Sequence, residues 1–332
     1  MYQKRFETGG TFPAAGPAAP VLGAMLAAAA LFFLGSCNMP TGQDTETNRN
    51  VFNDLPYGSH EKQKLDLVFP DIPENISAPI PAVLYIHGGS WIDGDKDDDT
   101  FDTLKTSAAG TGLATASMNY RLLNFEKPSE TGCEDMLDDV HDAIDLVKKK
   151  SSELGVEINR LCIIGVSAGA HLALLYSYTR AGQSSLPVEF CVSASGPTDF
   201  TDPAWYSGDA ADGSPIPLPL KLLLVSALAG ESFTQDDLQG GQINPAKEQV
   251  LKKISPVEYA GGAVPTFFAH GRKDTVVPFS NAERLEKALP AEKKLGFLEF
   301  PNSGHGLNAP EDSSILDDFY AKIKDLFTKL NS

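Results

Sequence analysis

The chain has 332 residues, of which 42% are hydrophobic and 21% are charged, and its formal net charge at pH 7 is −17. This length and apolar content are sufficient for one large domain or, less readily, two small ones. The negative charge excludes nucleic acid as an expected partner, because its phosphates would be repelled. The sequence shows no internal repeat and no long heptad pattern.

The N-terminal segment resembles a bacterial secretion signal. Lys4 and Arg5 precede an apolar run, Val21 to Leu34, that is too short for an ordinary transmembrane span. The run ends in Leu34-Gly-Ser-Cys37, which resembles the lipobox of lipoprotein signals. That resemblance implies that residues 1–36 are removed as a signal peptide and that Cys37 carries a lipid. The alternative is an ordinary signal peptide with a chance cysteine.

The next residues, 37–50, are polar and contain Pro, Gly and Thr, so they are predicted to form a flexible tether. The folded domain is then expected to span residues 51–332. The lipobox implies an exported lipoprotein held at a membrane by its lipid. Asn38, rather than an aspartate, follows the lipidated cysteine, and by the same resemblance this favours the outer membrane or cell envelope.

From residue 63 onward, short apolar runs alternate with segments of helical periodicity. The first run has apolar side chains at every second position, whereas Val83–Ile86 is continuously apolar, as in a parallel strand buried on both faces. The predicted strands cover residues 63–69, 83–86, 113–120, 161–164, 189–195, 266–270 and 296–300. The predicted helices cover residues 101–107, 136–147, 170–176, 282–289 and 315–330. This order predicts a doubly wound, mostly parallel α/β sheet with ligands at the carboxyl ends of its strands.

A long insertion, residues 200–262, separates the last two predicted strands from the others. It is rich in Pro, Gly and Asp, and an insertion of this kind is usually a lid or binding loop. Its apolar run Leu218–Leu228 predicts a helix that packs on the core and walls the substrate site. Pro215, Pro217 and Pro219 are expected to stiffen the entrance, because each ring fixes φ.

The stretch Gly165-Val-Ser-Ala-Gly169 lies between a predicted strand and a predicted helix. A strand that reverses at once into a helix strains its turn residue, and flanking glycines remove the Cβ atoms that would clash. We expect Ser167 to sit exposed above the sheet at the helix N-terminus, where free N–H groups favour developing negative charge. This setting is typical of a nucleophile.

Three candidate catalytic residues, Ser167, Asp274 and His305, each follow a predicted strand. A serine hydroxyl is a poor nucleophile and needs a base, which histidine can supply near neutral pH. An aspartate would hold the imidazole tautomer and stabilise the imidazolium. The order Ser, Asp, His is that of the α/β-hydrolase triad. Asp199, also just past a strand end, is the rival acid.

The segment His87-Gly-Gly-Ser90 follows a predicted central strand. Its glycines let backbone N–H groups turn inward, so Gly89 and Ser90 are the candidates for an oxyanion hole. The N–H of Ala168, the residue after the nucleophile, completes it. His87 is expected to hold this loop by hydrogen bonds. His270 is expected to be structural.

These segments together resemble the esterase and lipase branch of α/β-hydrolases marked by a His-Gly-Gly-x-Trp loop. That branch includes the bifunctional feruloyl and acetyl-xylan esterase-like enzymes and the hormone-sensitive-lipase relatives. The matching segments are Tyr85–Trp91, Asn119–Arg121, Gly165–Gly169, Ser255-Pro256, His270-Gly271 with Asp274, and Gly304–Gly306. Two departures stand out. Ser90 replaces the third glycine of the His-Gly-Gly-Gly form, and the insertion 200–262 has no counterpart that we can place.

The resemblance, which runs from about Tyr57 to the C-terminus, implies a serine carboxylic-ester hydrolase that forms an acyl-enzyme and needs no cofactor or metal. Short-acyl esters, including acetylated or feruloylated carbohydrates, are the expected substrates. A lipase or a peptidase of the prolyl-oligopeptidase group is an alternative, although an amide leaving group is harder to expel. A non-catalytic binding protein on the same fold would be marked by loss of the Ser, His or Asp. The sequence does not indicate an oligomeric state.

Overall fold

The computed structural model describes residues 50–71, 78–108, 110–207, 216–241 and 243–331. The predicted signal peptide, Cys37 and nearly all of the predicted tether lie outside these residues, as does Pro215. Among the described residues, one eight-stranded sheet has the order β1-β2-β4-β3-β5-β6-β7-β8. Its strands are β1 Val51–Pro56, β2 Lys64–Val68, β3 Ile80–Ile86, β4 Ala114–Met118, β5 Ile158–Val166, β6 Val188–Ala194, β7 Thr266–Gly271 and β8 Lys294–Phe300.

The sheet is mostly parallel, as predicted. The strands from β4 through β3, β5, β6 and β7 to β8 pair in parallel. Only β2 runs against its neighbours, β1 and β4. All seven residues of β3 and all five of β4 are buried, which explains the continuous apolar sequence of β3 and the small side chains of β4.

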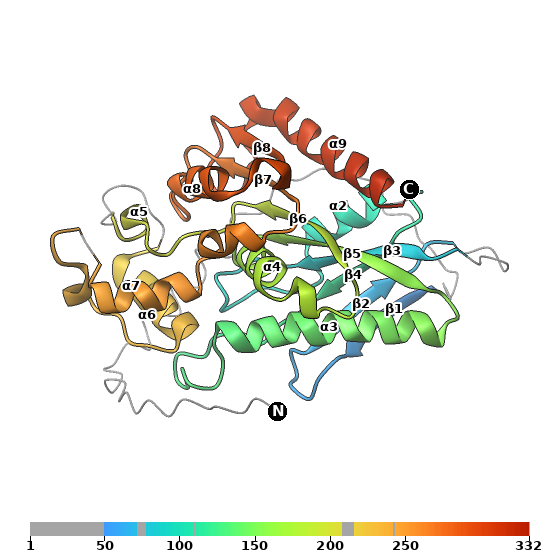
Figure 1. Cartoon of the computed structure of the whole chain (residues 1–332), viewed down its shortest axis with the longest axis horizontal. Coiled ribbons are helices and arrows are strands. Elements are labelled where there is room, and N and C mark those ends of the chain that lie inside the picture. The colour runs from blue at the N-terminus through green and yellow to red at the C-terminus, as the bar shows by residue number, and fades with distance from the viewer. Residues whose placement is uncertain (1–49, 72–77, 109, 208–215, 242, 332) are drawn as a thin grey trace.

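Helices cover both faces of this sheet. The α-helices of the described residues are α2 Asp99–Ala108, α3 Cys133–Glu153, α4 Ala168–Thr179, α5 Pro203–Tyr206, α6 Leu218–Ala229, α7 Pro245–Lys253, α8 Ser280–Ala288 and α9 Ser313–Leu330. Buried side chains of α2 and α9 form one core layer, and those of α3, α4 and α8 join the layer on the opposite face. The prediction of a doubly wound sheet is therefore confirmed, and Figure 1 shows α9 and α3 on opposite sides of it.

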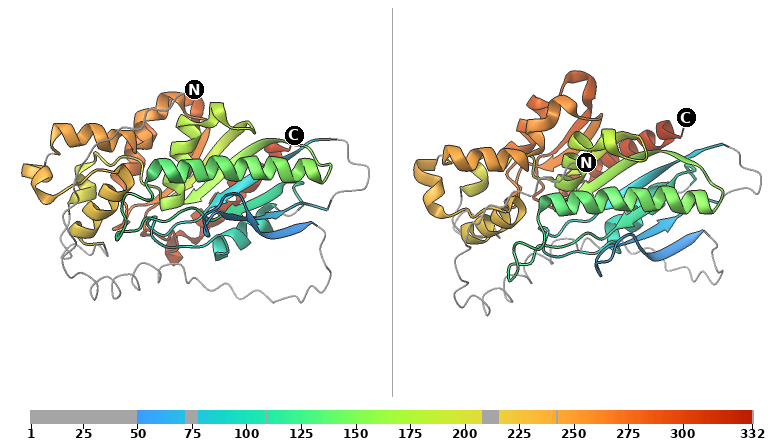
Figure 2. Two further views of the ribbon diagram at one scale, coloured as in Figure 1. Left: turned by 90° about the horizontal axis from the view of Figure 1, so that it is seen from below. Right: turned by 60° about the horizontal axis from the view of Figure 1, so that its bottom comes forward.

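The insertion lies between β6 and β7 and forms a cap of short helices. Figures 1 and 2 show α5, α6 and α7 gathered at one end of the molecule. The predicted helix over the apolar run is present as α6, which begins after Pro217 and ends at Gly230. Gly230 adopts the left-handed conformation, with φ 64°, that commonly terminates a helix. Within the described residues, no helix has the length and hydropathy needed to cross a membrane.

The edge strand β1 is the one strand that the sequence pattern did not predict. Its apolar residues Val51, Phe52 and Leu55 do not alternate, and the pairing with β2 shifts register between Phe52 and Leu55. Most of β1 is exposed or half-buried, so burial imposed no strict period on its sequence. Cys162 in β5 and Cys191 in β6 are free, buried thiols.

Candidate active site

The turn between β5 and α4 holds Ser167 in a strained conformation, with φ 54° and ψ −119°. Its glycines are required by the close packing around it. A Cβ on Gly165 would lie 2.2 Å from the carbonyl oxygen of Gly169, and a Cβ on Gly169 would lie 2.1 Å from that of Ile86. No residue larger than glycine fits at these two positions. The turn places Ser167 where the carboxyl end of β3 meets the start of α4.

Ser167, His305 and Asp274 come together in one chain of hydrogen bonds. The Nε2 atom of His305 lies 2.8 Å from the Oγ atom of Ser167. The Nδ1 atom of His305 lies 2.8 Å from the Oδ2 atom of Asp274. Ser167 follows β5, Asp274 follows β7 and His305 follows β8, so three parallel strands deliver the side chains to one edge of the sheet.

The carboxylate of Asp274 is fully buried and fully hydrogen-bonded. Its Oδ1 atom accepts the N–H groups of Val276 and Val277, at 2.8 and 2.9 Å. Its Oδ2 atom contacts His305 and also the Nε2 atom of His270, at 3.1 Å. Burial by itself would raise the pKa of Asp274, but attraction to His305 and hydrogen bonds from both histidines outweigh it. The pKa is therefore held well below its usual range, and the group stays ionised.

The rival acid, Asp199, does not approach the histidine chain. Its Oδ2 atom lies 2.7 Å from Nη1 of Arg284, and its Oδ1 atom accepts the N–H and hydroxyl of Thr201. This carboxylate is therefore occupied in an ion pair and a local turn.

The loop 87–91 lies against the serine turn. A Cβ on Gly88 would be 3.3 Å from the Cβ of Ser167. Gly89, Ser90 and Trp91 all have positive φ, of 108°, 52° and 61°, so the backbone reverses there. The N–H groups of Gly89 and Ser90 find no acceptor within the described part of the chain, which leaves them available to a ligand.

His87 and Ala168 also lie in this region. His87 is buried and stacks on Tyr120, with ring centroids 4.5 Å apart, and its Nδ1 contacts the carbonyl of Gly88. Burial lowers the pKa of His87 to about 4, so it is a neutral support for the loop. Ala168 is the first residue of α4, so its N–H belongs to the free donors of the helix start.

The expectation that Ser167 is exposed is wrong, since only 8% of the residue is accessible. The cap covers it. The small pocket beside the serine is lined by Ser90, Trp91, Ser167, Pro197, Trp205, Ile216, Lys221, Leu224, Val276 and Val277. Because Ile216, Lys221 and Leu224 come from α6 or the residues just before it, the apolar helix of the insertion walls the site, as its sequence suggested.

Two residues of the site were missed from sequence. His270, treated only as structural, contacts the candidate acid, and the signal was its position four residues before Asp274 at the same strand end. Lys221, 2% exposed, lines the pocket beside the serine. Its signal was a single basic residue within the otherwise apolar run of α6.

The chain is similar in sequence to known esterases. Esterase LipC of Mycobacterium tuberculosis is 26% identical over 76% of this chain and 59% of its own length. The probable isoprenylcysteine alpha-carbonyl methylesterase ICME of Oryza sativa subsp. japonica is 33% identical over 42% of this chain and 31% of its own length. The chain thus spans less than two thirds of these curated relatives.

Solved structures show the same fold. The bifunctional GH43-CE protein of Bacteroides eggerthii has a TM-score of 0.65 at 21% identity, covering 87% of this chain and 39% of that one. A bacterial heroin esterase has a TM-score of 0.60 at 20% identity, covering 95% and 90%. The fold is that of the α/β-hydrolase esterases. The BD-FAE family model matches residues 65–289, which is more than half of the chain, and the chain therefore belongs to the BD-FAE family.

Proposed function

We propose that this chain is a serine hydrolase that cleaves carboxylic esters of short acyl groups through an acyl-enzyme. The observation that carries the proposal is the hydrogen-bonded chain Ser167–His305–Asp274, closed at 2.8 Å on both sides of the imidazole. Its esterase relatives and its membership of the BD-FAE family support the same reaction class.

The proposed mechanism uses the chain's own groups at each step. His305 Nε2 takes the proton of Ser167 Oγ as that oxygen attacks the ester carbonyl carbon. The carbonyl oxygen becomes negative and accepts the N–H groups of Gly89, Ser90 and Ala168. Asp274, which stays ionised, stabilises the imidazolium. The imidazolium then gives its proton to the leaving alcohol, and a water activated by the same histidine hydrolyses the acyl-enzyme.

The acyl group is proposed to be small. The pocket beside Ser167 is small, with about 290 Å³ of space including its open mouth, and Trp205, Ile216 and Leu224 of the cap line it. Each methylene that enters an apolar pocket contributes about 0.8 kcal/mol, so this gain should end after a few carbons. Acetylated carbohydrates fit this pocket better than feruloylated ones, because a feruloyl group would need room for an aromatic ring.

Two measurements test this proposal. Ser167→Ala should lower kcat on every ester by roughly 10⁵ to 10⁶ while circular dichroism shows an intact fold. Wild-type kcat/KM on soluble aryl esters should be highest from acetyl to butyryl. Faster turnover of decanoyl or palmitoyl esters would identify a lipase. Cleavage of peptide substrates but not of ester substrates would identify a peptidase. A Ser167→Ala protein with full activity would overturn the serine mechanism.

The location of the protein is a separate proposal. We propose that it is an exported lipoprotein anchored through a lipid on Cys37, because the sequence Leu34-Gly-Ser-Cys37 resembles a lipobox. Mass spectrometry of the N-terminus of the native protein decides this. An acylated Cys37 at the terminus is expected, whereas an unmodified terminus beyond Cys37 would contradict the anchor.

A further inference from the structure

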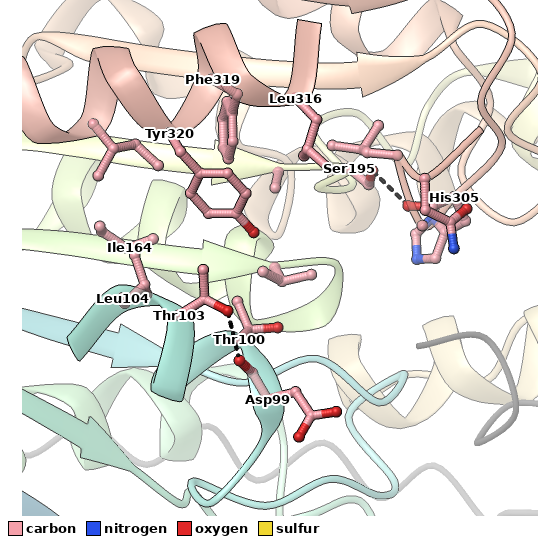
Figure 3. A pocket seen from close by; sticks show the side chains of 16 residues that line it. Asp99, Thr100, Thr103, Leu104, Ile164, Ser195, His305, Leu316, Phe319 and Tyr320 are labelled. Carbon is pink, nitrogen blue, oxygen red and sulfur yellow. Dashed lines mark hydrogen bonds between the residues drawn. The ribbon is translucent and has the colours of Figure 1, made fainter. Parts of the chain in front are cut away.

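A second, larger hollow lies on the other face of the sheet, between α2 and α9. It encloses about 930 Å³ including its open mouth. We call it the α2/α9 groove, and it is lined by Asp99, Thr100, Thr103, Leu104, Ile164, Val166, Ala194, Ser195, His305, Gly306, Leu307, Asn308, Leu316, Phe319, Tyr320 and Ile323. Figure 3 shows α9 side chains on one wall, α2 side chains on the other and His305 at one end.

The groove and the pocket beside the serine share no lining residue, and each is lined by a different residue of the candidate triad. Ser167 lines the small pocket, whereas His305 lines the groove. The end of the groove at His305 is firmly built, because Ser195 Oγ donates a hydrogen bond to the carbonyl of His305 at 2.8 Å. Leu307 then turns with φ 53°, and its side chain is buried among the groove residues. The two hollows therefore flank the candidate triad.

The chemistry of ester cleavage gives these two sides different occupants. When the tetrahedral intermediate collapses, the bond between its carbon and the alcohol oxygen breaks, and that oxygen receives the proton of the His305 imidazolium. The acyl carbon stays on Ser167 Oγ. The alcohol must therefore leave from beside His305, while the acyl chain remains beside Ser167. The larger hollow thus adjoins the histidine that releases the alcohol.

We propose that the α2/α9 groove is the binding site for the alcohol part of the ester, and that it takes an alcohol bearing a ring with one apolar face. This inference rests on the proposed esterase function and names the part of the substrate that the groove selects. It assigns selectivity for the alcohol to α2 and α9 and leaves selectivity for the acyl group to the cap.

The lining carries the chemistry for such a ring. Its floor and sides are apolar, with Leu104, Ile164 and Leu316 among them. Tyr320 projects from α9 with its ring in the groove and its hydroxyl directed towards α2 (Figure 3). That hydroxyl has no hydrogen-bond partner among the residues that the structure describes, although the side chain is half-buried. The flat ring of Tyr320 can stack on an apolar face, and its hydroxyl can bond a polar edge.

The rim adds polar groups to this apolar floor. Thr100 and Asn308 line the groove, and Asn308 and Asp99 are exposed there. Groups of this kind can bond the hydroxyls of a pyranose, whereas an aryl alcohol would use only the apolar floor and the aromatic ring. Both alcohols share a ring with an apolar face, so the experiment must separate them.

The test fills the groove and compares acetyl esters of different alcohols. Thr103→Trp, in the full mature chain, should lower kcat/KM for 4-nitrophenyl acetate and for an acetylated methyl pyranoside at least tenfold more than for ethyl acetate. A tenfold change corresponds to about 1.4 kcal/mol. Leu316→Trp fills the groove from the opposite wall and should act in the same direction. Intrinsic reactivity of each ester cancels when each variant is compared with wild type.

The chain offers a matched control on the same helix. Thr103 and Thr106 both donate from Oγ1 to the carbonyl four residues earlier, at 3.0 Å, but Thr106 is exposed and lies outside the groove. Thr106→Trp should therefore leave the ratios between the three acetates at their wild-type values. Tyr320→Phe distinguishes the two ring types. Loss of the hydroxyl should lower kcat/KM for the acetylated pyranoside several-fold and leave kcat/KM for the aryl ester unchanged.

Each outcome has a defined meaning. A wild-type protein that cleaves no ester would refute the proposed function itself. If esters are cleaved but Thr103→Trp and Leu316→Trp change the ratios no more than Thr106→Trp, the groove assignment is wrong. A groove-filling variant that instead alters the preference for acyl length would show that the groove holds the acyl chain, and would equally overturn the inference.

Discussion

Asp199, in the loop after β6, and Asp274, in the loop after β7, are both buried, and comparing them shows what turns such a residue into a candidate catalytic acid. Over the whole residue Asp199 is 4% exposed and Asp274 is 8% exposed, although the carboxylate of Asp274 is fully buried, and each follows a parallel strand of the sheet. Asp199 lies 2.7 Å from the guanidinium of Arg284, whereas Asp274 contacts the two imidazoles of His270 and His305. The position in the fold is equivalent, and the partner decides the role.

The physical reason lies in what each partner can do next. A guanidinium never releases its proton in proteins, so Asp199 is locked in a permanent ion pair. An imidazole can accept a proton and later donate it, and an ionised aspartate on its other nitrogen makes that change less costly. The local sequence therefore does not distinguish two buried carboxylates at strand ends, although their chemistry differs.

The largest test of this comparison exchanges each aspartate for asparagine. Asp274→Asn should lower kcat by about 10⁴, because the amide favours the wrong imidazole tautomer and removes the negative charge. Asp199→Asn, the matched control, should change kcat much less. Steady-state kinetics on an acetyl ester measure both. If Asp199→Asn proves the more damaging change, Asp274 is not the acid.

The second test removes the neighbouring imidazole. His270→Phe keeps a ring beside Phe279 but loses the Nε2 contact with Asp274, so the carboxylate is held less firmly. We expect kcat to fall about tenfold with KM little changed, since a hydrogen bond to a charged group contributes roughly 1.5–3 kcal/mol, part of it in the transition state. His270→Gln supplies an amide donor and should recover part of the loss. Equal losses in both variants would assign His270 a packing role only.

The third test concerns the histidine beside the other loop. His171 contacts Phe200 edge-on and bonds the carbonyl of Ile254, and no carboxylate is among these contacts. Burial therefore lowers its pKa to about 4, below the unfolded value of about 6.5. The unfolded chain binds the proton more readily, so this contribution is complete above pH 6.5 and is lost as pH falls towards 4. At pH 5 the loss is about 2 kcal/mol.

Urea denaturation at pH 7.5 and pH 5 measures that loss. In His171→Gln the amide can still donate to the carbonyl of Ile254 but cannot titrate. The free energy of unfolding of this variant should therefore fall by about 2 kcal/mol less than that of wild type between the two pH values. Identical pH dependence in both proteins would mean that His171 is not buried in its neutral form.

The smallest test breaks the ion pair of the β6 loop. Arg284→Met should lower the free energy of unfolding by about 1 kcal/mol, because it leaves the buried Asp199 without its cation, while the half-exposed arginine limits the effect. Activity on acetyl esters should be retained. Arg272→Met is the control, since Arg272 pairs with the exposed Glu299 and should contribute little. A large loss of kcat in Arg284→Met would mean that the β6 loop also contributes to catalysis, contrary to the distinction drawn between Asp199 and Asp274.

Much of the architecture could be predicted from local sequence because burial imposes a period on it. The continuously apolar β3 and the helical spacing along α3 were predicted correctly, since both lie against the core. The exposed edge strand β1 was missed, because it has no buried face that would require alternating apolar residues. The tight turn at Ser167 could be predicted from its glycines for a similar reason. At Gly165 and Gly169 backbone atoms approach too closely for any other residue.

The sequence by itself determined the order of elements and the candidates Ser167, Asp274 and His305, because strand ends and tight turns are local features. Only the tertiary structure decided which aspartate meets the histidine, since both candidates follow a strand and nothing local distinguishes their partners. It also decided that Ser167 is covered, through contacts with a cap helix more than fifty residues away along the chain. Contacts between residues distant in sequence depend on how the layers pack, and packing is a property of the whole fold.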